Sequence, residues 1–273
     1  MEKKNYKKCR ILIQINSTNA QPWNDIVLKG QYDTFIKGNI HKHLKFQKVV
    51  CNQNLNSRLR NIDWWFFQKN WISRSRLIRL TRWFLTFPLK FWKPSMEIQE
   101  ENPSYDTLYI KMPDFATFGV LKNIEMFRFA LKQNFDFLVM INNSTFLNLQ
   151  KLVENVNTFP RKKLISGRFI DDSLETVSGS FMILSIDVVK LLVSNKLNLR
   201  FDLPNDVAIS KLLVKDKFIR IKIFNKDFDN VGLIRNLNNS EIQKFVSIRC
   251  KSGNLSNRND VMIMREIHAK VMK

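Results

Sequence analysis

Glycine and proline are scarce in this sequence, with seven of each among 273 residues. That scarcity, together with the lack of any internal period of repeat length, argues against a low-complexity or repeat protein. The hydrophobic content of 44% and aromatic content of 12% are those of a globular protein, and the chain is long enough to bury a sizeable core. Length alone allows one large domain or two small ones.

Cysteines and long hydrophobic runs are also few. Cys9, Cys51 and Cys250 lie far apart and lack metal-ligand spacing, so we expect free thiols in a reducing compartment. Residues 1–15 combine a basic lead with an apolar run too short for a signal peptide or a transmembrane helix, and no other window is long and apolar enough to span a bilayer. We therefore expect a cytoplasmic protein, with peripheral attachment to the inner membrane surface left open.

Acidic residues are outnumbered, since 24 Asp and Glu against 45 Lys and Arg give a net charge of +21. The excess is uneven: residues 1–95 hold 19 basic and 4 acidic residues, whereas residues 96–273 hold 26 and 20. The N-terminal third is therefore expected to meet an anionic partner, which could be a phospholipid surface, a nucleic acid or a phosphorylated acceptor. For the scattered lysines of 3–8 and 42–48, a solvated surface is the simpler interpretation.

The charge makes a nucleic-acid-binding protein the main rival of any enzymatic function. The sequence has no helix-turn-helix, zinc-finger or aromatic RNA-binding signature. Alternating strands and helices with polar clusters at strand ends favour a ligand crevice instead. Nucleic acid is therefore not the partner that we expect.

Residues 54–105 interrupt the otherwise regular pattern with five tryptophans, and we expect a basic, aromatic-rich insertion there. Residues 74–93 contain six basic and no acidic residues, interleaved with large apolar ones. On a helix, Arg76, Arg79 and Arg82 would share one stripe. A second stripe would hold Leu77, Leu80 and Phe84. Such a helix is typical of binding to an anionic membrane surface, but an insertion whose aromatic side chains pack on the main domain explains the pattern equally well.

Hydrophobic periodicity predicts strands alternating with helices over most of the chain. The predicted strands are 10–15, 46–51, 107–112, 135–141, 163–170, 179–184 and 218–224. The predicted helices are 22–29, ended by Gly30, and 115–133, 146–159, 185–196, 204–214 and 259–271. This alternation indicates an α/β fold, with a mostly parallel central sheet flanked by helices in a single domain of residues 1–273.

Polar clusters follow three of the predicted elements. In α/β folds, ligand crevices form at the ends of parallel strands. One cluster is 16–19, after the first strand. A second is Asn142, Asn143 and Ser144, after the most apolar strand. The third is 203–209, where Asp206 opens a helix.

Five segments in this order resemble glycosyltransferase family 31, which includes the beta-1,3-galactosyltransferases and Fringe, and its looser bacterial and viral relatives. They are PDFATFGVLKNIEMFRFAL, with Lys122; FDFLVMINNSTFLNL; LISGRFI, with Gly167 and Arg168; SGSFMILSIDVVKLL; and LPNDVAI. The resemblance covers residues 107–215 well, the first strand weakly and residues 54–105 not at all.

The resemblance implies a GT-A fold and an inverting transfer of a sugar from a nucleoside-diphosphate sugar to a hydroxyl of a glycan or glycolipid, in surface polysaccharide or glycolipid assembly. It implies that Asp206 is the general base that takes the acceptor proton. Without the resemblance, a helix N-terminal cap would be the simpler role for Asp206. The donor-binding residues implied are Ser17, Lys122, Asn142, Asn143, Ser144 and Arg168. The acceptor-binding residues implied are Gly179 and Ser180.

The sequence departs from the family at its metal-binding triplet, which normally supplies carboxylate oxygens to Mn²⁺ or Mg²⁺. Here Asn142 and Ser144 stand at the metal-binding positions, and His268, the only late histidine, reads as a solvated helix residue. Two interpretations follow. Basic side chains could neutralise the diphosphate in place of a metal, or the chain could be a non-catalytic binding or partner domain. The candidate basic residues are Lys122, Arg168, Arg249 and Lys251.

Overall fold

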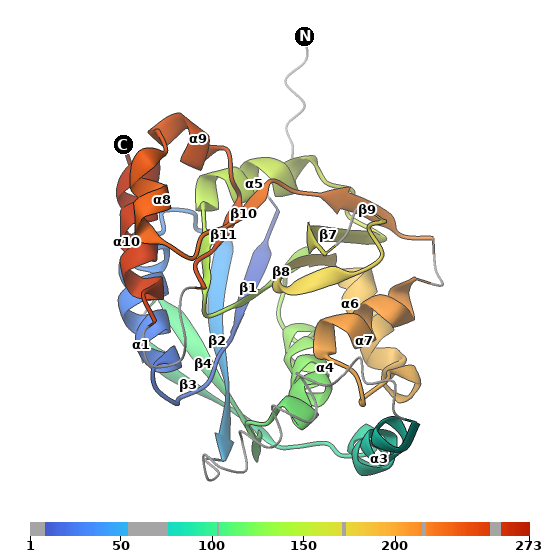
Figure 1. Cartoon of the computed structure of the whole chain (residues 1–273). Coiled ribbons are helices and arrows are strands. Elements are labelled where there is room, and N and C mark those ends of the chain that lie inside the picture. The colour runs from blue at the N-terminus through green and yellow to red at the C-terminus, as the bar shows by residue number, and fades with distance from the viewer. Residues whose placement is uncertain (1–8, 54–75, 103, 171–172, 215–216, 252–257) are drawn as a thin grey trace.

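An eight-stranded sheet forms the centre of the molecule (Figure 1). The computed structural model describes residues 9–53, 76–102, 104–170, 173–214, 217–251 and 258–273. The strand order is β3-β4-β2-β1-β5-β8-β7-β9. The bounds are β1 Ile11–Asn16, β2 Leu44–Gln53, β3 Met96–Asn102, β4 Tyr105–Pro113, β5 Phe137–Asn142, β7 Leu164–Phe169, β8 Val177–Ser185 and β9 Ile219–Lys222.

The middle of the sheet is parallel. Strands β4, β2, β1 and β5 run in the same direction, and β7 pairs parallel with β9. Antiparallel pairs occur where β5 meets β8, where β8 meets β7 and at the β3 edge. The expected α/β fold with a mostly parallel central sheet flanked by helices is confirmed, and the sheet is mixed rather than purely parallel.

Strands β1 and β5 are buried on both faces, which is why their sequences are nearly continuous apolar runs. Alternate side chains enter opposite cores: Ile13 and Val139 pack on one face, and Leu12 and Leu138 on the other. Figure 1 shows the helices on the two sides of the sheet. One side carries α1 Trp23–Asp25, η1 Ile26–Ile36, α5 Leu149–Thr158, α8 Val231–Asn236, α9 Asn239–Gln243 and α10 Asp260–Val271. The other carries α4 Gly119–Ala130, α6 Ile186–Ser194 and α7 Asn205–Leu213.

A second, three-stranded sheet lies beside the carboxyl end of β5. Its order is β10-β11-β6, with bounds β10 Asn225–Asp227, β11 Ser247–Arg249 and β6 Thr145–Leu147. Because β6 begins three residues after β5 ends, this small sheet is held against the turn that follows β5. None of its strands is predicted by the hydrophobic pattern, since three-residue strands are too short to show a period.

The prediction that Gly30 ends the first helix is wrong, because the chain continues through it as the π-helix η1. A Cβ at position 30 would lie 2.8 Å from the Sδ atom of Met264 on α10. The missing side chain therefore lets α10 approach η1 closely. Gly30 serves packing between helices and not helix termination.

Two further element boundaries differ from expectation. The helix expected over 146–159 starts later, at α5, where the Asn148 side chain accepts a hydrogen bond from the Lys151 amide. The residues before it pair with β11 as β6 instead, a long-range contact that no local pattern reveals. Residues 96–102, expected within the insertion, form edge strand β3 on β4. Residues 54–75 of that insertion lie outside the described residues.

The three cysteines are buried free thiols, as expected. Burial raises the pKa of the Cys51 thiol to about 12, so this sulfur stays protonated and unreactive at neutral pH. Among the described helices, none combines the length and the apolar character needed to cross a bilayer.

Candidate active site

The first two polar clusters meet at the carboxyl edge of the sheet. Strands β1 and β5 pair in parallel with Asn16 opposite Asn142, so Ser17 and the triplet that starts at Asn142 are neighbours. The buried Lys122 on α4 joins them, since its Nζ donates to the Ser17 carbonyl at 2.5 Å and lies 3.6 Å from Asp114. The structure thus brings together residues that are more than a hundred positions apart.

The Asn142 side chain organises the turn after β5. Its Oδ1 accepts hydrogen bonds from the Ser144 amide at 3.1 Å and from the Thr145 hydroxyl at 2.8 Å. The Asn142 carbonyl accepts from the side-chain amide of Gln31 at 2.9 Å. The Asn142 amide oxygen is therefore engaged in holding the triplet in shape, and Asn143 at its centre is buried.

Asp206 lies beside the acceptor-binding residues implied by the resemblance. Its Oδ2 accepts from the Gly179 amide at 3.1 Å, and its Oδ1 accepts from the Val207 amide at 2.9 Å. The Ser180 carbonyl in turn accepts from the Thr145 hydroxyl at 2.8 Å. Thr145 therefore links the triplet to β8. Asp206 lies in the first turn of α7.

The small sheet places Arg249 next to the triplet. In the pairing of β11 with β6, Arg249 stands opposite Thr145, and the Cys250 amide donates to the Ser144 carbonyl at 2.7 Å. On its other side Arg249 stands opposite Asp227 of β10. Asp227 forms an ion pair of 2.6 Å with Arg168 of β7. Two of the predicted basic residues therefore converge on one short stretch of backbone.

Arg258 is a member of this site that sequence reasoning missed. Its Nη2 donates to the Ser144 hydroxyl at 2.8 Å. The guanidinium also pairs with the fully buried Asp260 and lies 4.4 Å from the centre of the Trp23 ring. The only local signal was an arginine two residues before an aspartate at a helix start, which many surface segments share.

The arginines and Lys251 form one electrostatic group. Burial of the Arg249 guanidinium lowers its pKa, and the charges of Arg168 and Arg258 lower it further. Asp227 and Asp206 are close enough to act on Arg249 in the opposite direction. Partial burial and the charges of Arg249 and Arg258 lower the pKa of Lys251. We call Arg168, Arg249, Lys251 and Arg258 the cation cluster.

The cation cluster has unused capacity to bind an anion. Two of its members, Arg168 and Arg258, have carboxylate partners, but Arg249 and Lys251 form no ion pair with any described residue. Moreover, Nη1 of Arg168 and Nε of Arg249 are buried and have no hydrogen-bond acceptor within the described part of the chain. Buried donors without an acceptor are costly, and a phosphate oxygen would satisfy them.

The triplet does not fit Mn²⁺ or Mg²⁺. Hard divalent cations favour carboxylate oxygens, whereas the Asn142 amide oxygen here already accepts two hydrogen bonds and the Ser144 hydroxyl accepts one from a guanidinium. The positive charge of Arg258 would also repel a cation at that point. Within the described residues no group of three His, Cys, Asp or Glu side chains could hold a metal.

His268 was expected to be a solvated helix residue, and this is wrong in one respect. It does lie on α10, but its ring is half-buried, 6.3 Å from that of Phe146, and burial lowers its pKa. Phe146 follows Thr145 on β6, so its side chain points to the opposite face from the triplet. His268 is therefore not part of the site.

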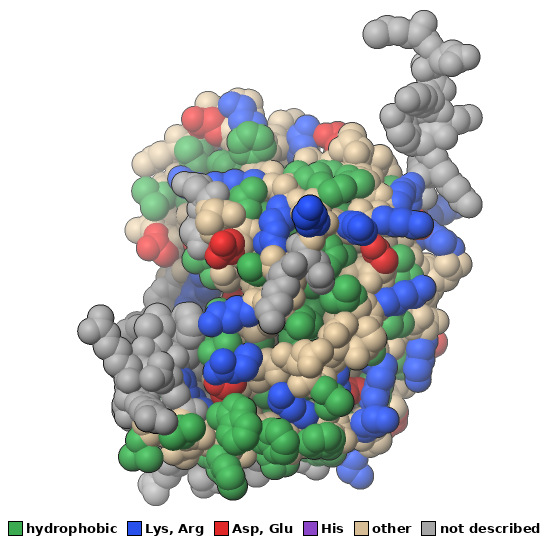
Figure 2. Space-filling view, turned by 90° about the vertical axis from the view of Figure 1, so that its right-hand side faces the viewer, with side chains coloured by type: hydrophobic (Ala, Val, Ile, Leu, Met, Phe, Trp, Pro, Cys, Tyr) green, Lys and Arg blue, Asp and Glu red, His purple; other side chains and the backbone are tan. Residues whose placement is uncertain are grey.

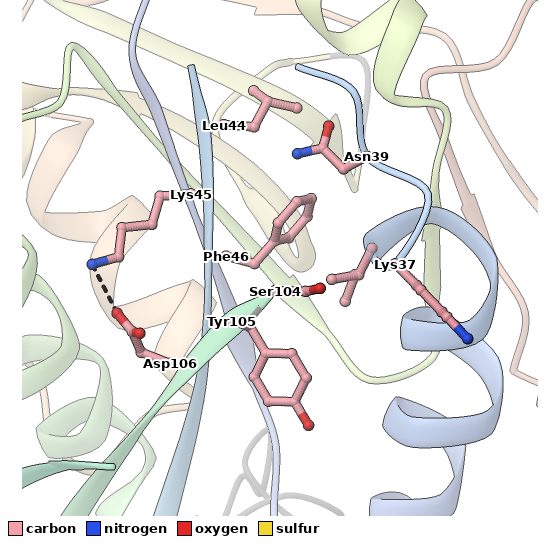
Figure 3. Close-up of a pocket in the computed structure, with 9 residues that line it drawn as sticks. Lys37, Asn39, Leu44, Lys45, Phe46, Ser104, Tyr105 and Asp106 are labelled. Atoms are coloured by element: carbon pink, nitrogen blue, oxygen red, sulfur yellow. Dashed lines mark ion pairs between the residues drawn. The ribbon is translucent and has the colours of Figure 1, made fainter. Parts of the chain in front are cut away.

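A separate pocket of about 300 Å³ lies at the amino ends of β2 and β4 (Figure 3). Lys45 and Asp106 form an ion pair of 2.7 Å at its side, and Phe46 and Tyr105 come from the two strands. Ligands of α/β folds bind at the carboxyl ends of strands, whereas this pocket lies at their amino ends. This pocket therefore lies away from the candidate active site and has no evident role in it.

Comparison with known proteins finds similarity only at the level of structure. No family model and no curated protein sequence matches the chain. A mannosyltransferase from Pyrobaculum calidifontis, solved with GDP-mannose and Mn²⁺, is 8% identical with a TM-score of 0.42. Glycosyltransferase GlyE of Streptococcus pneumoniae is 11% identical with a TM-score of 0.42, and mouse xyloside xylosyltransferase 1 is 8% identical with a TM-score of 0.41.

The three matches differ in the share of each chain that the matched region covers. The matched regions cover 79%, 95% and 90% of this chain, respectively. They cover 55%, 60% and 97% of the other proteins, so the chain spans little more than half of the first two. The resemblance to family 31 stays a prediction.

Proposed function

We propose that this protein transfers a sugar from a nucleoside-diphosphate sugar to a hydroxyl of a glycan or glycolipid, and that the cation cluster binds the diphosphate without a metal. The observation that carries the proposal is the gathering of buried, incompletely paired guanidinium groups around the triplet, next to the carboxylate of Asp206. Guanidinium groups bind phosphate oxygens in a bidentate manner and keep their charge at any physiological pH.

The proposed reaction is a single displacement. The acceptor oxygen attacks the anomeric carbon, its proton passes to the Asp206 carboxylate, and the bond from the anomeric carbon to the diphosphate breaks. The departing diphosphate gains negative charge, which Arg168 and Arg249 would stabilise. Asp206 keeps free lone pairs for this role, because each of its oxygens accepts only one backbone hydrogen bond.

The other predicted site residues have positions that suit this assignment. Ser17 and Asn143 lie at the carboxyl ends of β1 and β5, where the nucleotide would rest, and Lys122 holds the Ser17 backbone in place. Gly179 and Ser180 lie beside Asp206, where the acceptor would enter. These donor and acceptor roles are part of the proposal.

A non-catalytic binding domain is the second candidate. It is favoured by the hydrogen bonds that the Asp206 carboxylate already makes to the Gly179 and Val207 amides, since an aspartate that only ties α7 to β8 makes the same contacts. Such a domain would bind the nucleotide sugar through the cation cluster and would not turn it over. Measurement of turnover separates the two candidates.

The test combines a turnover assay over a panel of nucleoside-diphosphate sugars with a strong chelator and three variants. Activity is expected to persist in the chelator. Asp206→Asn should lower turnover by about 10²–10⁴-fold with donor binding retained, while the exposed control Asp229→Asn should leave it unchanged. Arg249→Gln should weaken donor binding. Strict dependence on added Mn²⁺, or full activity of Asp206→Asn, would contradict the mechanism, and donor binding without turnover would support the second candidate.

A further inference from the structure

Helix α3 (Arg76–Thr86) is amphipathic, but it buries polar side chains and exposes apolar ones, the reverse of an ordinary surface helix. Its polar side chains Arg82 and Thr86 are 1% and 2% exposed. On its apolar stripe, Leu77 and Phe84 are 74% and 75% exposed. A surface helix of a globular protein normally buries its apolar stripe and leaves its charged residues in water. Packing of these apolar side chains onto the main domain, one of the two interpretations of the sequence, is therefore wrong for this stripe.

The exposed stripe continues into the next segment, the 3-10 helix η3 (Phe87–Lys90). The rings of Trp83 and Phe87 are 5.3 Å apart, and those of Phe87 and Phe91 are 5.6 Å apart. Exposed side chains of α3, η3 and the residue after it therefore form one continuous surface. We call it the apolar face, and its main members are Leu77, Leu80, Trp83, Phe84, Phe87 and Phe91.

Figure 2 shows hydrophobic side chains gathered along the lower part of the molecule, with lysine and arginine side chains around them. Monomeric proteins seldom expose a contiguous group of large apolar side chains without a partner for it. Removing several aromatic and leucine side chains from water would be favourable. The apolar face is thus a candidate interaction surface.

The apolar face is fixed to the folded body. Burial would raise the pKa of Asp202, but hydrogen bonds from Arg200 and the charges of Arg200 and Arg82 outweigh that effect and lower it. Arg82 and Thr86, on the inner side of α3, are buried. Two lysines add hydrogen bonds to backbone carbonyls: Lys90 donates to Leu197 at 2.8 Å and Lys196 donates to Trp92 at 2.6 Å.

The charge around the apolar face identifies the kind of partner. Besides the buried Arg82, residues 74–93 carry five basic residues and no acidic one, and the whole chain has a net charge of +21. Lys93, directly after the face, is exposed. Tryptophan and phenylalanine together with basic residues are the composition by which helices bind in the interface of anionic bilayers. A protein partner of ordinary composition would not require this excess of one sign.

We propose that the apolar face docks the protein on a bilayer that contains anionic lipids, with α3 lying in the plane of the interface. The exposed aromatic and leucine side chains would enter the boundary between headgroups and acyl chains, and exposed basic side chains such as that of Lys93 would pair with lipid phosphates. The proposal is independent of the proposed catalytic function, because it rests on α3 and η3 alone.

The test is co-sedimentation of the full chain with phosphatidylcholine vesicles, with and without phosphatidylglycerol. Binding to the anionic vesicles at low salt, weakened by added salt, is expected. Phe84→Ser should reduce the partition coefficient about tenfold. Phe224→Ser is the matched control, since Phe224 is 76% exposed and Phe84 is 75% exposed. Thermal midpoints of both variants would show that the fold is retained.

Three results would overturn the proposal. The first is no binding to anionic vesicles at low salt, and the second is equal loss of binding in Phe84→Ser and Phe224→Ser. The third is self-association in the analytical ultracentrifuge that Phe84→Ser abolishes, without vesicle binding, because the apolar face would then be an interface between copies of this chain.

Discussion

At the scale of single residues, Gly167 shows how backbone geometry supports the site. It has φ of +133°, and a Cβ at this position would lie 2.4 Å from the Phe181 carbonyl oxygen of the neighbouring strand. Only glycine avoids both the strained conformation and the clash. Because Gly167 precedes Arg168 on β7, its conformation helps to direct that arginine toward Asp227.

Gly167→Ala is therefore expected to destabilise the protein by about 3 kcal/mol, the sum of backbone strain and steric overlap. Gly38→Ala is the control, since the nearest atom to a Cβ there is the Thr34 carbonyl oxygen at 3.9 Å. Urea denaturation of both variants measures the difference. Equal stability of the two variants would show that the β7 backbone relaxes around the new methyl group.

At the scale of elements, the packing of α10 against β6 buries a titratable histidine. Short strand β6 presents Thr145 to the site and Phe146 to α10, where the ring of Phe146 lies 6.3 Å from that of His268. Burial lowers the pKa of His268 below its ordinary value of 6.5. Because successive side chains of a strand point to opposite faces, Thr145 faces the site while Phe146 faces His268 in the helix layer.

Stability should fall as pH drops below about 6.5, because the unfolded chain then protonates His268 while the folded chain does not until its lower pKa is reached. His268→Gln cannot take up this proton, so the variant should lose less stability than the parent over that interval. Urea denaturation of both proteins above and below about pH 6.5 tests this. Identical pH dependence would mean that other groups dominate.

At the scale of the whole molecule, two groups of basic residues lie in surroundings with different chemistry. The cation cluster combines buried guanidinium groups with the polar turn after β5 and suits a compact anion. The apolar face combines basic residues with exposed aromatic side chains and suits an extended anionic surface. A general basic coat would show neither buried donors without acceptors nor an outward apolar stripe.

A ligand that binds only the folded state raises its stability, by about 2.7 kcal/mol at a concentration of 100 times Kd, which corresponds to a rise in Tm of about 5–10 °C. Nucleoside diphosphates are expected to give such a rise in the presence of a chelator. Arg249→Gln should reduce the rise, whereas Arg265→Gln should not, since Arg265 is exposed and pairs with Asp33. Differential scanning fluorimetry would measure it, and an equal rise for both variants would place the anion elsewhere.

The sequence by itself determined the α/β alternation, the central strands and the polar clusters at their ends. The physical reason is local: strands buried on both faces need continuous apolar runs, and helices that cover a sheet need an apolar stripe. The absence of a carboxylate from Asn142, Asn143 and Ser144 was also visible without a structure. These features are properties of neighbouring residues.

Only the tertiary structure decided which charges meet. Arg168, Arg249 and Arg258 come from a strand of the large sheet, a strand of the small sheet and the segment before α10. The pairing of β11 with β6 places Arg249 beside the triplet, Arg258 donates to Ser144, and Arg168 joins the small sheet through Asp227. Tertiary packing also decided the direction of α3. Periodicity reveals that a helix has an apolar stripe, but whether that stripe faces the core or the outside depends on tertiary packing, which here buries Arg82 and leaves Leu77 and Phe84 exposed.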